Sequence, residues 1–200
     1  MKFENLRLVK FKRSSWFFAI LLILILTNCD KRKPKYTQVA GETFEAAPIK
    51  AVDLIGEYLV FIFMSPECPL SENYSKTINE LSTEYVDKNV RFYIVFPGIF
   101  YPRPQIEVFI EKYHLPTEMV IYDPDHLFKD YFSATITPEA FLTDVTGTIL
   151  YKGGIDNWAI TLGKQRQVIT EYYVVDAVES ALKNESIKTK KTRAVGCIIE

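Results

Sequence analysis

The chain has 200 residues, of which 48% are apolar and 24% are charged, which is an ordinary globular composition. This length suits one domain with a core of normal size, preceded by a leader segment. The formal net charge of −1 lacks the basic excess that binding to nucleic acid requires, so we expect no nucleic-acid partner.

Residues 1–28 have the pattern of a secretory signal. Residues 1–13 are basic, and residues 16–26 form an apolar run without a charged residue. This run is shorter than the roughly 18 to 20 residues that a comfortable bilayer span needs. The sequence Leu-Thr-Asn-Cys that ends at Cys29 resembles the bacterial lipoprotein box, in which the cysteine becomes acylated. We therefore predict a lipoprotein-type signal peptide at 1–28 and a lipid anchor on Cys29.

Residues 29–41 are polar and basic and show no hydrophobic periodicity, so they are predicted to be a tether. Their basic side chains lie either near anionic lipid headgroups or simply in solvent. An uncleaved signal anchor is the alternative to lipidation. In both cases the domain is expected at 42–183 in the cell envelope, held at a membrane and facing the periplasm or the cell exterior. The charged residues 184–200 are expected to form a mobile C-terminal tail.

The stretch from Val60 to Met64 is a continuous apolar run, and a Ser-Pro turn follows it shortly before Cys68. Pro69 and a segment of helical period come next, so the pattern predicts a buried strand that delivers Cys68 to the first turn of a helix. The partial positive charge at a helix N-terminus favours the thiolate, whereas the neighbouring Glu67 opposes it. Cys68 is therefore the candidate reactive group, with an inert buried thiol as the alternative.

Hydrophobic periodicity and turn residues predict the remaining elements of an α/β domain. Residues 42–55 are expected to hold a short first strand and a loop, and a turn at 145–147 joins two strands into an antiparallel hairpin. Parallel strands joined by helices, followed by a hairpin and a last helix, form a three-layer α/β sandwich. The other expected strands are 57–64, 90–96, 119–122, 139–144 and 148–152, and the expected helices are 71–86, 104–114, 127–132 and 169–182.

The chain contains three cysteines, which are Cys29, Cys68 and Cys197. If Cys29 carries lipid, two thiols remain in an oxidising compartment. They form a static disulfide, a redox couple or two unrelated thiols. Because residues 183–193 are expected to be mobile, the tail is able to bring Cys197 to Cys68.

Two motifs resemble those of the thioredoxin-like superfamily. Cys68-Pro-Leu-Ser71 stands where these proteins have Cys-x-x-Cys, and Thr137-Pro138, followed by a strand and a hairpin, is similar to their cis-proline segment. An X-Pro bond is also the ordinary place for a cis peptide, so we expect one here. The second motif is most similar to exported redoxins and to thiol-disulfide oxidoreductases of the cytochrome-maturation type. The ending Thr-Arg-Ala-Val-Gly-Cys is similar to a redoxin subgroup that pairs one cysteine in Cys-Pro-x-Ser with a C-terminal Gly-Cys.

The resemblance implies a thioredoxin-like sandwich with a central mixed sheet flanked by helices. It also implies a membrane-anchored thiol-disulfide oxidoreductase that needs no cofactor and acts on protein thiols or disulfides, or on a small thiol or peroxide. Cys68 would be the attacking thiolate, Ser71 its hydrogen-bond partner and Cys197 the resolving thiol. Since Ser71 replaces the second cysteine of the motif, Cys68 alone cannot release a mixed disulfide. The implied substrate platform consists of Thr137, Pro138 and Pro69.

Two other functions remain as alternatives. A thiol peroxidase resembling peroxiredoxins would have Ser or Thr three residues before its cysteine, as Ser65 is here, but Phe61 stands where those proteins have proline. A non-catalytic binding or metal-delivery module is the other alternative, although copper-handling relatives use two nearby cysteines and a histidine. His114 and His126 are interpreted as surface or capping residues. We expect no metal site, because the acidic cluster at Asp123, Asp125 and Asp130 lacks the glycine and the glutamate of a calcium loop and is interpreted as a solvated turn.

Overall fold

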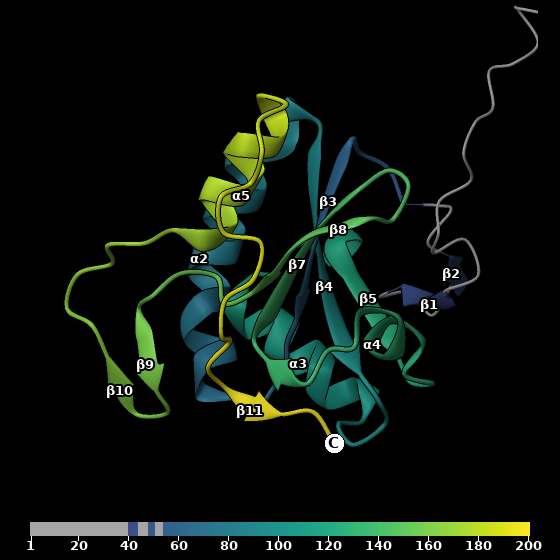
Figure 1. The fold of residues 1–200 in the computed structure, drawn as a ribbon. Coiled ribbons are helices and arrows are strands. Elements are labelled where there is room, and N and C mark those ends of the chain that lie inside the picture. The colour runs from purple at the N-terminus through teal and green to yellow at the C-terminus, as the bar shows by residue number, and fades with distance from the viewer. Residues whose placement is uncertain (1–39, 44–47, 51–53) are drawn as a thin grey trace, which may run out of the picture. The chain divides into compact units, whose positions relative to one another are not determined.

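The computed structural model describes residues 40–43, 48–50 and 54–200 (Figure 1). The predicted signal peptide, the lipidation site Cys29 and most of the predicted tether lie outside the described residues. Residues 33–200 form one compact unit. Within the described ranges, no helix has both the length and the apolar character that crossing a bilayer requires.

A mixed seven-stranded sheet forms the centre of this unit, in the order β2-β1-β5-β4-β3-β7-β8. Strands β3, β4 and β5 are parallel, whereas β7 pairs antiparallel with both β3 and β8, and β1 pairs antiparallel with β5. The sheet therefore has the mixed character that the sequence predicts. The strands are β1 (Ala40–Thr43), β2 (Pro48–Lys50), β3 (Tyr58–Phe63), β4 (Val90–Pro97), β5 (Val120–Asp123), β7 (Glu139–Asp144) and β8 (Ile149–Gly153).

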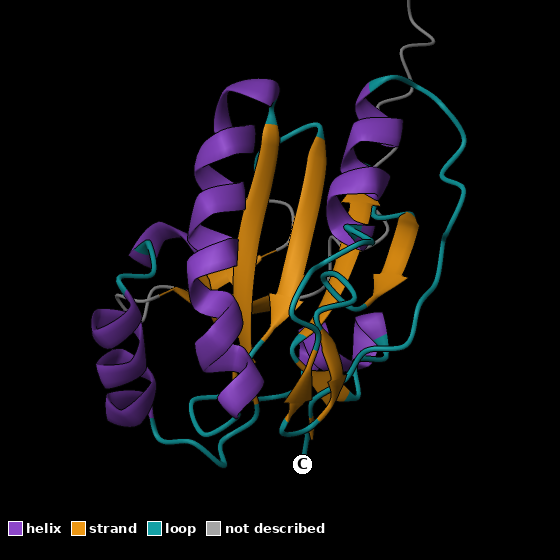
Figure 2. Cartoon of the chain, turned by 90° about the vertical axis from the view of Figure 1, so that its left-hand side faces the viewer, coloured by secondary structure: helices purple, strands orange, loops and turns teal. Residues whose placement is uncertain are grey.

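Helices cover both faces of the sheet, which gives the predicted three layers. The helices are α2 (Pro69–Tyr85), α3 (Arg103–Tyr113), α4 (Leu127–Phe132) and α5 (Tyr173–Leu182), with short 3-10 turns η2 (Val86–Lys88) and η3 (Thr117–Met119). Apolar side chains of α2, α3 and α5 pack in one core cluster with Val60 and Ile62 of β3. Phe128 and Phe132 of α4 pack in a second cluster with Phe61 on the opposite face. Figure 2 views the molecule from the side of α2 and α5, which lie in front of the strands.

The strand that leads to the site is the best-buried element of the domain. From Val60 to Met64 the side chains have no exposed surface. Phe61 contacts the rings of Tyr93 at 5.6 Å and Phe132 at 4.8 Å between centroids. Because β3 is hydrogen-bonded on both sides and packed on both faces, the residues after it start from a rigid base.

Two predictions about the second half of the domain differ from the structure. The last helix was expected from residue 169, but it begins at Tyr173. The reason is that the Asn157 side chain bonds both the hydroxyl and the backbone N–H of Thr170, at 2.8 and 3.1 Å, which holds this segment outside a helix. In addition, a small hairpin of β9 (Ala159–Thr161) and β10 (Lys164–Gln165) lies in a region for which no element was expected.

The segment after α5 makes specific contacts instead of being a mobile tail. In Figure 1 this yellow segment runs from the end of α5 to a short strand, β11 (Cys197–Ile198). On the way, the backbone N–H of Lys152 donates to Lys190, and the N–H of Thr192 donates to Lys152, both at 3.0 Å. The tail is therefore joined to the edge strand β8.

Candidate functional site

The strand–turn–helix unit places Cys68 as the sequence predicts. After β3, the N–H of Met64 still donates to Val95 of β4 at 2.9 Å, and the N–H of Cys68 closes a turn onto Ser65 at 3.2 Å. Cys68 is the N-cap residue of α2, with extended backbone angles, and Pro69 is the first helical residue. Since proline has no N–H, the first free amide hydrogens of this helix belong to Leu70 and Ser71.

The predicted Thr137–Pro138 peptide bond is cis, and it lies beside Cys68. The thiol of Cys68 donates to the carbonyl oxygen of Thr137 at 3.0 Å. The hydroxyls of Ser65 and Thr137 are 2.9 Å apart and hydrogen-bonded. Thus the turn before α2 and the segment before β7 are joined by two side-chain contacts.

The tail brings the second thiol to this position. Strand β11 pairs antiparallel with β6 (Ile136–Thr137), with Cys197 opposite Thr137. The N–H of Ile199 donates to Thr135 at 3.0 Å and extends the pairing. In this register the Cys197 thiol donates to Cys68 Sγ across 2.8 Å, and both cysteines are free.

A glycine allows this close approach. A β-carbon added to Gly196 would overlap the carbonyl group of Thr137, so the tail can pair with β6 only when this position carries no side chain. Gly153 has a related role at the other end of the tail. Its φ is +148°, and a β-carbon there would overlap Thr192.

The two thiols differ in acidity. Burial raises the pKa of Cys68, but the hydrogen bonds from the Cys197 thiol and from the backbone N–H groups of Ser71 and Leu70 lower it further, so the net pKa lies below the ordinary value. Burial, the hydrogen bond to Cys68 and the negative charge of Cys68 raise the pKa of Cys197 to about 12. The charge therefore resides on Cys68 and the shared proton on Cys197.

Two residues beside the thiol differ from their expected roles. The hydroxyl of Ser71 accepts a hydrogen bond from the N–H of Ser65 at 3.2 Å, and the backbone N–H of Ser71, rather than its hydroxyl, supports the thiolate. Glu67 is exposed and accepts a hydrogen bond from Gln105 of α3 at 2.9 Å. Solvent therefore screens the Glu67 charge, which was expected to oppose ionisation of Cys68.

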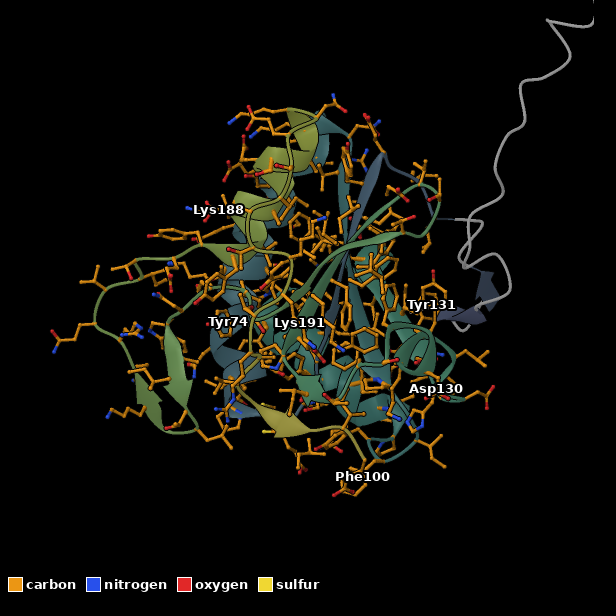
Figure 3. All side chains as sticks on the ribbon, in the orientation of Figure 1. Tyr74, Phe100, Asp130, Tyr131, Lys188 and Lys191 are labelled. Atoms are coloured by element: carbon orange, nitrogen blue, oxygen red, sulfur yellow. The ribbon has the colours of Figure 1, made fainter. Side chains whose placement is uncertain are left out.

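A cavity of about 550 Å³ opens beside the two sulfur atoms. Its walls include Ser65, Tyr101, Thr137 and the tail from Gly196 onward. The apolar side chain of Phe100, also in the wall, is 60% exposed, and in Figure 3 it lies at the same edge of the molecule as β11. The site thus combines a buried nucleophile with an open, partly apolar surface next to it.

The acidic cluster after β5 requires a correction. Asp123 is buried and is not part of a solvated turn, because its carboxylate accepts the N–H groups of Phe128 and Lys129 at 3.0 and 2.8 Å and so caps α4. Burial raises the pKa of Asp123 to about 6, although these two hydrogen bonds act in the opposite direction. His126 is the N-cap residue of α4. Among residues 40–43, 48–50 and 54–200, no three His, Cys, Asp or Glu side chains are grouped as metal ligands would be.

Comparison with solved structures identifies the fold. A hypothetical protein from Sinorhizobium meliloti 1021 superposes with a TM-score of 0.70 at 17% identity over 80% of this chain and 88% of its own. A secreted disulfide oxidoreductase from Mycobacterium tuberculosis gives a TM-score of 0.50 at 19% identity, covering 57% and 82%. A putative thioredoxin from Neisseria meningitidis gives 0.50 at 23% identity, covering 56% and 74%.

The fold is thioredoxin-like. The predicted fold class is thereby confirmed, and the likeness establishes the fold alone at these identities. No protein-family model matches the sequence. No curated protein matches it either.

The sequence interpretation did not find the residues that seat the tail. Thr192 is the main one: its hydroxyl is 2.6 Å from the hydroxyl of Tyr151 and 3.0 Å from the N–H of Gly154. The Gly153-Gly154 pair directly after a predicted strand was the available signal, since paired glycines mark a close approach of another chain segment.

Proposed function

We propose that this protein is a thiol-disulfide oxidoreductase in which Cys68 attacks and Cys197 resolves. The observation that carries the proposal is the hydrogen bond of 2.8 Å between the two sulfur atoms, with the proton on Cys197. Cys68 is thus held as the nucleophile, and its partner is already beside it. Sulfur atoms at this separation need to approach by less than about 1 Å to bond.

The first step is attack of the Cys68 thiolate on a substrate disulfide. A bond forms between Cys68 Sγ and one substrate sulfur, the substrate S–S bond breaks, and the second substrate sulfur leaves as a thiolate. The N–H groups of Leu70 and Ser71 stabilise the charge on Cys68 before attack, and the leaving thiolate is protonated from solvent. The product is a mixed disulfide on Cys68.

The second step releases the substrate. Once Cys68 is no longer a thiolate, the hydrogen bond and the negative charge that hold the proton on Cys197 are lost, so Cys197 ionises more easily. Its thiolate attacks Cys68 Sγ, the mixed disulfide breaks, and the substrate leaves as a thiol. Two electrons have then passed to the substrate, and the protein holds a Cys68–Cys197 disulfide; the reverse sequence oxidises a substrate dithiol.

The proposal includes a location outside the cytoplasm, with the domain held at a membrane through lipidated Cys29. The basic and apolar signal pattern at residues 1–28 supports it. The secreted oxidoreductase of Mycobacterium tuberculosis, which has the same fold, supports it as well. The substrates are then exported protein thiols or disulfides, or a small thiol or peroxide. Metabolic labelling with a radioactive fatty acid tests the anchor, because the label is expected in the native chain and not in Cys29→Ser.

The redox proposal is tested with dithiobis-nitrobenzoate, a disulfide that releases one coloured thiolate for each thiol that attacks it. All chains carry Cys29→Ser, so that Cys68 and Cys197 are the only thiols. We expect the parent chain to release two coloured equivalents and to end as an internal disulfide, seen as a peptide link in mass spectrometry. With Cys197→Ser we expect one equivalent and a lasting adduct on Cys68.

Two results would contradict the proposal. If the parent chain keeps an adduct on each cysteine and forms no internal disulfide, Cys197 is not the resolving thiol. If Cys68→Ser consumes hydrogen peroxide or disulfides as fast as the parent chain, Cys68 is not the nucleophile.

A further inference from the structure

The nucleophile is covered by its own resolving thiol. Cys68 has no exposed surface, and the Cys197 thiol occupies a hydrogen-bonding position directly on its sulfur. Attack on a disulfide requires the three sulfur atoms to lie nearly in a line, so the substrate sulfur must come within bonding distance of Cys68 Sγ. With β11 docked, this space contains Cys197. No substrate therefore reaches Cys68 unless the tail moves.

The way in which the tail covers Cys68 also defines what can replace it. The tail lies on β6 as an extended strand, with backbone hydrogen bonds and with its cysteine opposite Thr137. Another extended segment in the same register would place its own sulfur where Cys197 Sγ lies. Backbone pairing provides affinity for any extended segment, and the side chains decide which segment fits.

From these contacts we propose that the tail from Val195 to Ile199 is an internal stand-in for the substrate and gates Cys68. The substrate is an extended polypeptide segment whose disulfide-bonded cysteine follows a glycine, and it pairs with β6 after the tail has left. This inference rests on the proposed function, because it identifies the substrate and the regulation of the same two thiols.

The tail has the construction of a latch on a fixed anchor. Thr192 is bound on three sides, by the N–H of Gly154, by the hydroxyl of Tyr151 and, through its own N–H, by Lys152. Beyond this anchor the pairing is only two residues long, and Ile198 is 77% exposed. Residues 193–196 are thus the hinge, and the strand that leaves is short. Since Thr192 stays bound, Cys197 remains close to Cys68 at a high effective concentration and returns after the first step.

Gly196 sets the specificity. Its α-carbon lies so close to the carbonyl of Thr137 that a β-carbon would overlap it, which excludes every residue but glycine at this position of a docked strand. The residue after the cysteine is not selected in this way, because the corresponding Ile198 points mostly to solvent. The apolar side chains of Phe100 and Leu162 in the cavity wall favour an apolar segment over a charged one.

The exchange balances as the proposed function requires. Cys68 Sγ bonds to the cysteine sulfur of the segment, and the other sulfur of that disulfide leaves as a thiolate. The returning tail then displaces the segment from β6, Cys197 gives its proton to solvent, and its sulfur bonds to Cys68. The segment leaves as a thiolate that takes up a proton.

The gate is tested by alkylation of Cys68 with iodoacetamide in two chains that both carry Cys29→Ser and Cys197→Ser. One has the native Gly196, so its tail docks, and the other carries Gly196→Ala, so its tail cannot. We expect alkylation to be about tenfold faster in the second chain, a factor that corresponds to about 1.4 kcal/mol of docking free energy. Because position 197 is the same in both chains, a difference in the donor to Cys68 does not contribute.

Two further chains secure the result. Gly163→Ala makes the same substitution where a β-carbon would meet nothing within 4 Å, and it should leave the rate unchanged. A chain that ends at Ala194 lacks the strand altogether and should react at least as fast as Gly196→Ala. Circular dichroism checks that each chain is folded. Equal rates for docked, undocked and truncated tails would overturn the gate.

The substrate class is tested on the chain that ends at Ala194 and carries Cys29→Ser. Two peptides, Val-Gly-Cys-Ile-Ile and Val-Val-Cys-Ile-Ile, are each joined through the cysteine to nitrothiobenzoate, whose release reports attack by Cys68. We expect the glycine peptide to react about tenfold faster, and a peptide with serine in place of its cysteine to inhibit that reaction. Equal rates would overturn the substrate class. They would leave the proposed function standing, because that depends on the internal disulfide of the tail-bearing chain.

Discussion

Cys68 and Cys197 are chemically the same residue in two different electrostatic environments. Cys68 lies at the end of a helix with two amide hydrogens directed at it, whereas Cys197 comes from a strand and has only Cys68 as a partner. A helix N-terminus stabilises an anion, and a buried group beside an anion resists ionisation. These positions assign nucleophile and proton donor before any substrate is present.

The proton shared by the two thiols gives a first prediction. Replacing Cys197 by alanine removes a hydrogen bond that lowers the pKa of Cys68, so this pKa is expected to rise. The measurement is the pH dependence of the ultraviolet absorbance of the thiolate in chains that carry Cys29→Ser. Cys197→Ser keeps a hydroxyl donor at this position and serves as the control, with a smaller rise expected. A pKa of Cys68 that is the same in all three chains would show that Cys197 does not act on it.

Asp123 gives a prediction about stability and pH. Its carboxyl has a pKa of about 6 in the folded chain against 3.8 as the ordinary value. Between these values the folded state holds a proton that the unfolded state has lost, so this contribution to stability is complete below about pH 4 and is lost as the pH rises through 6. The loss amounts to about 3 kcal/mol at most.

Urea unfolding of the parent chain and of Asp123→Asn at several pH values measures this effect. The amide keeps an acceptor oxygen for the N–H groups of Phe128 and Lys129 but has no proton to lose. We expect the decline in the free energy of unfolding between pH 4 and 6.5 to be smaller in the variant. Parallel curves would mean that another group titrates in this range.

At the scale of elements, the tail depends on a small ring of hydrogen bonds. The N–H of Gly154 donates to the Thr192 hydroxyl, that hydroxyl contacts the Tyr151 hydroxyl, and Tyr151 donates back to the carbonyl of Gly154 at 2.6 Å. Each member satisfies the next, which is the condition under which buried polar groups stabilise a structure. Lys191, which follows the same path, is labelled in Figure 3.

Thr192→Val is expected to open this ring. The substitution keeps the shape of the side chain but leaves the N–H of Gly154 without its acceptor, and this costs about 1–3 kcal/mol of stability. Formation of the Cys68–Cys197 disulfide should become slower as well, because the tail loses its anchor. Thr189→Val is the matched control, since Thr189 lies in the same segment and is exposed. Disulfide formation at the parent rate in Thr192→Val would contradict an anchoring role.

The sequence predicted those elements whose cause is local. The apolar run of β3, the Ser65-Pro66 turn and the periodic side chains of α2 are neighbours in the chain, so their pattern determines their structure. The seat of the tail is different, because Thr192 fits a space made by Tyr151 and by Gly153, and no local pattern reports such a long-range fit. The start of α5 was missed for a similar reason, since the bonds from Asn157 that delay it come from outside the helix.

At the scale of the whole molecule, the two thiols connect distant parts of the chain. Cys68 and Cys197 are 129 positions apart, so their disulfide would close a very large loop. In the chain-entropy model such a crosslink stabilises the fold by restricting the unfolded state, by about 2–5 kcal/mol. The oxidised protein should therefore be more stable than the reduced one.

Denaturant unfolding of the Cys29→Ser chain, oxidised and reduced, checks this difference. The chain that also carries Cys197→Ser provides the control, because it cannot form the crosslink and should unfold at one midpoint in both conditions. A reduced form as stable as the oxidised form would indicate that the disulfide strains the fold by as much as it restricts the unfolded chain.

The distance between the cysteines also has a consequence for biosynthesis. A ribosome adds Cys68 to the chain long before it adds Cys197, and the segments made first begin to fold first. During that interval β3, α2 and β4 can assemble, while the sulfur of Cys68 has no cover. An unfinished chain is thus the form most exposed to disulfide exchange with other proteins. Pairing of β11 with β6 marks the moment at which synthesis has passed this danger, so the newborn chain needs a reducing environment or rapid completion.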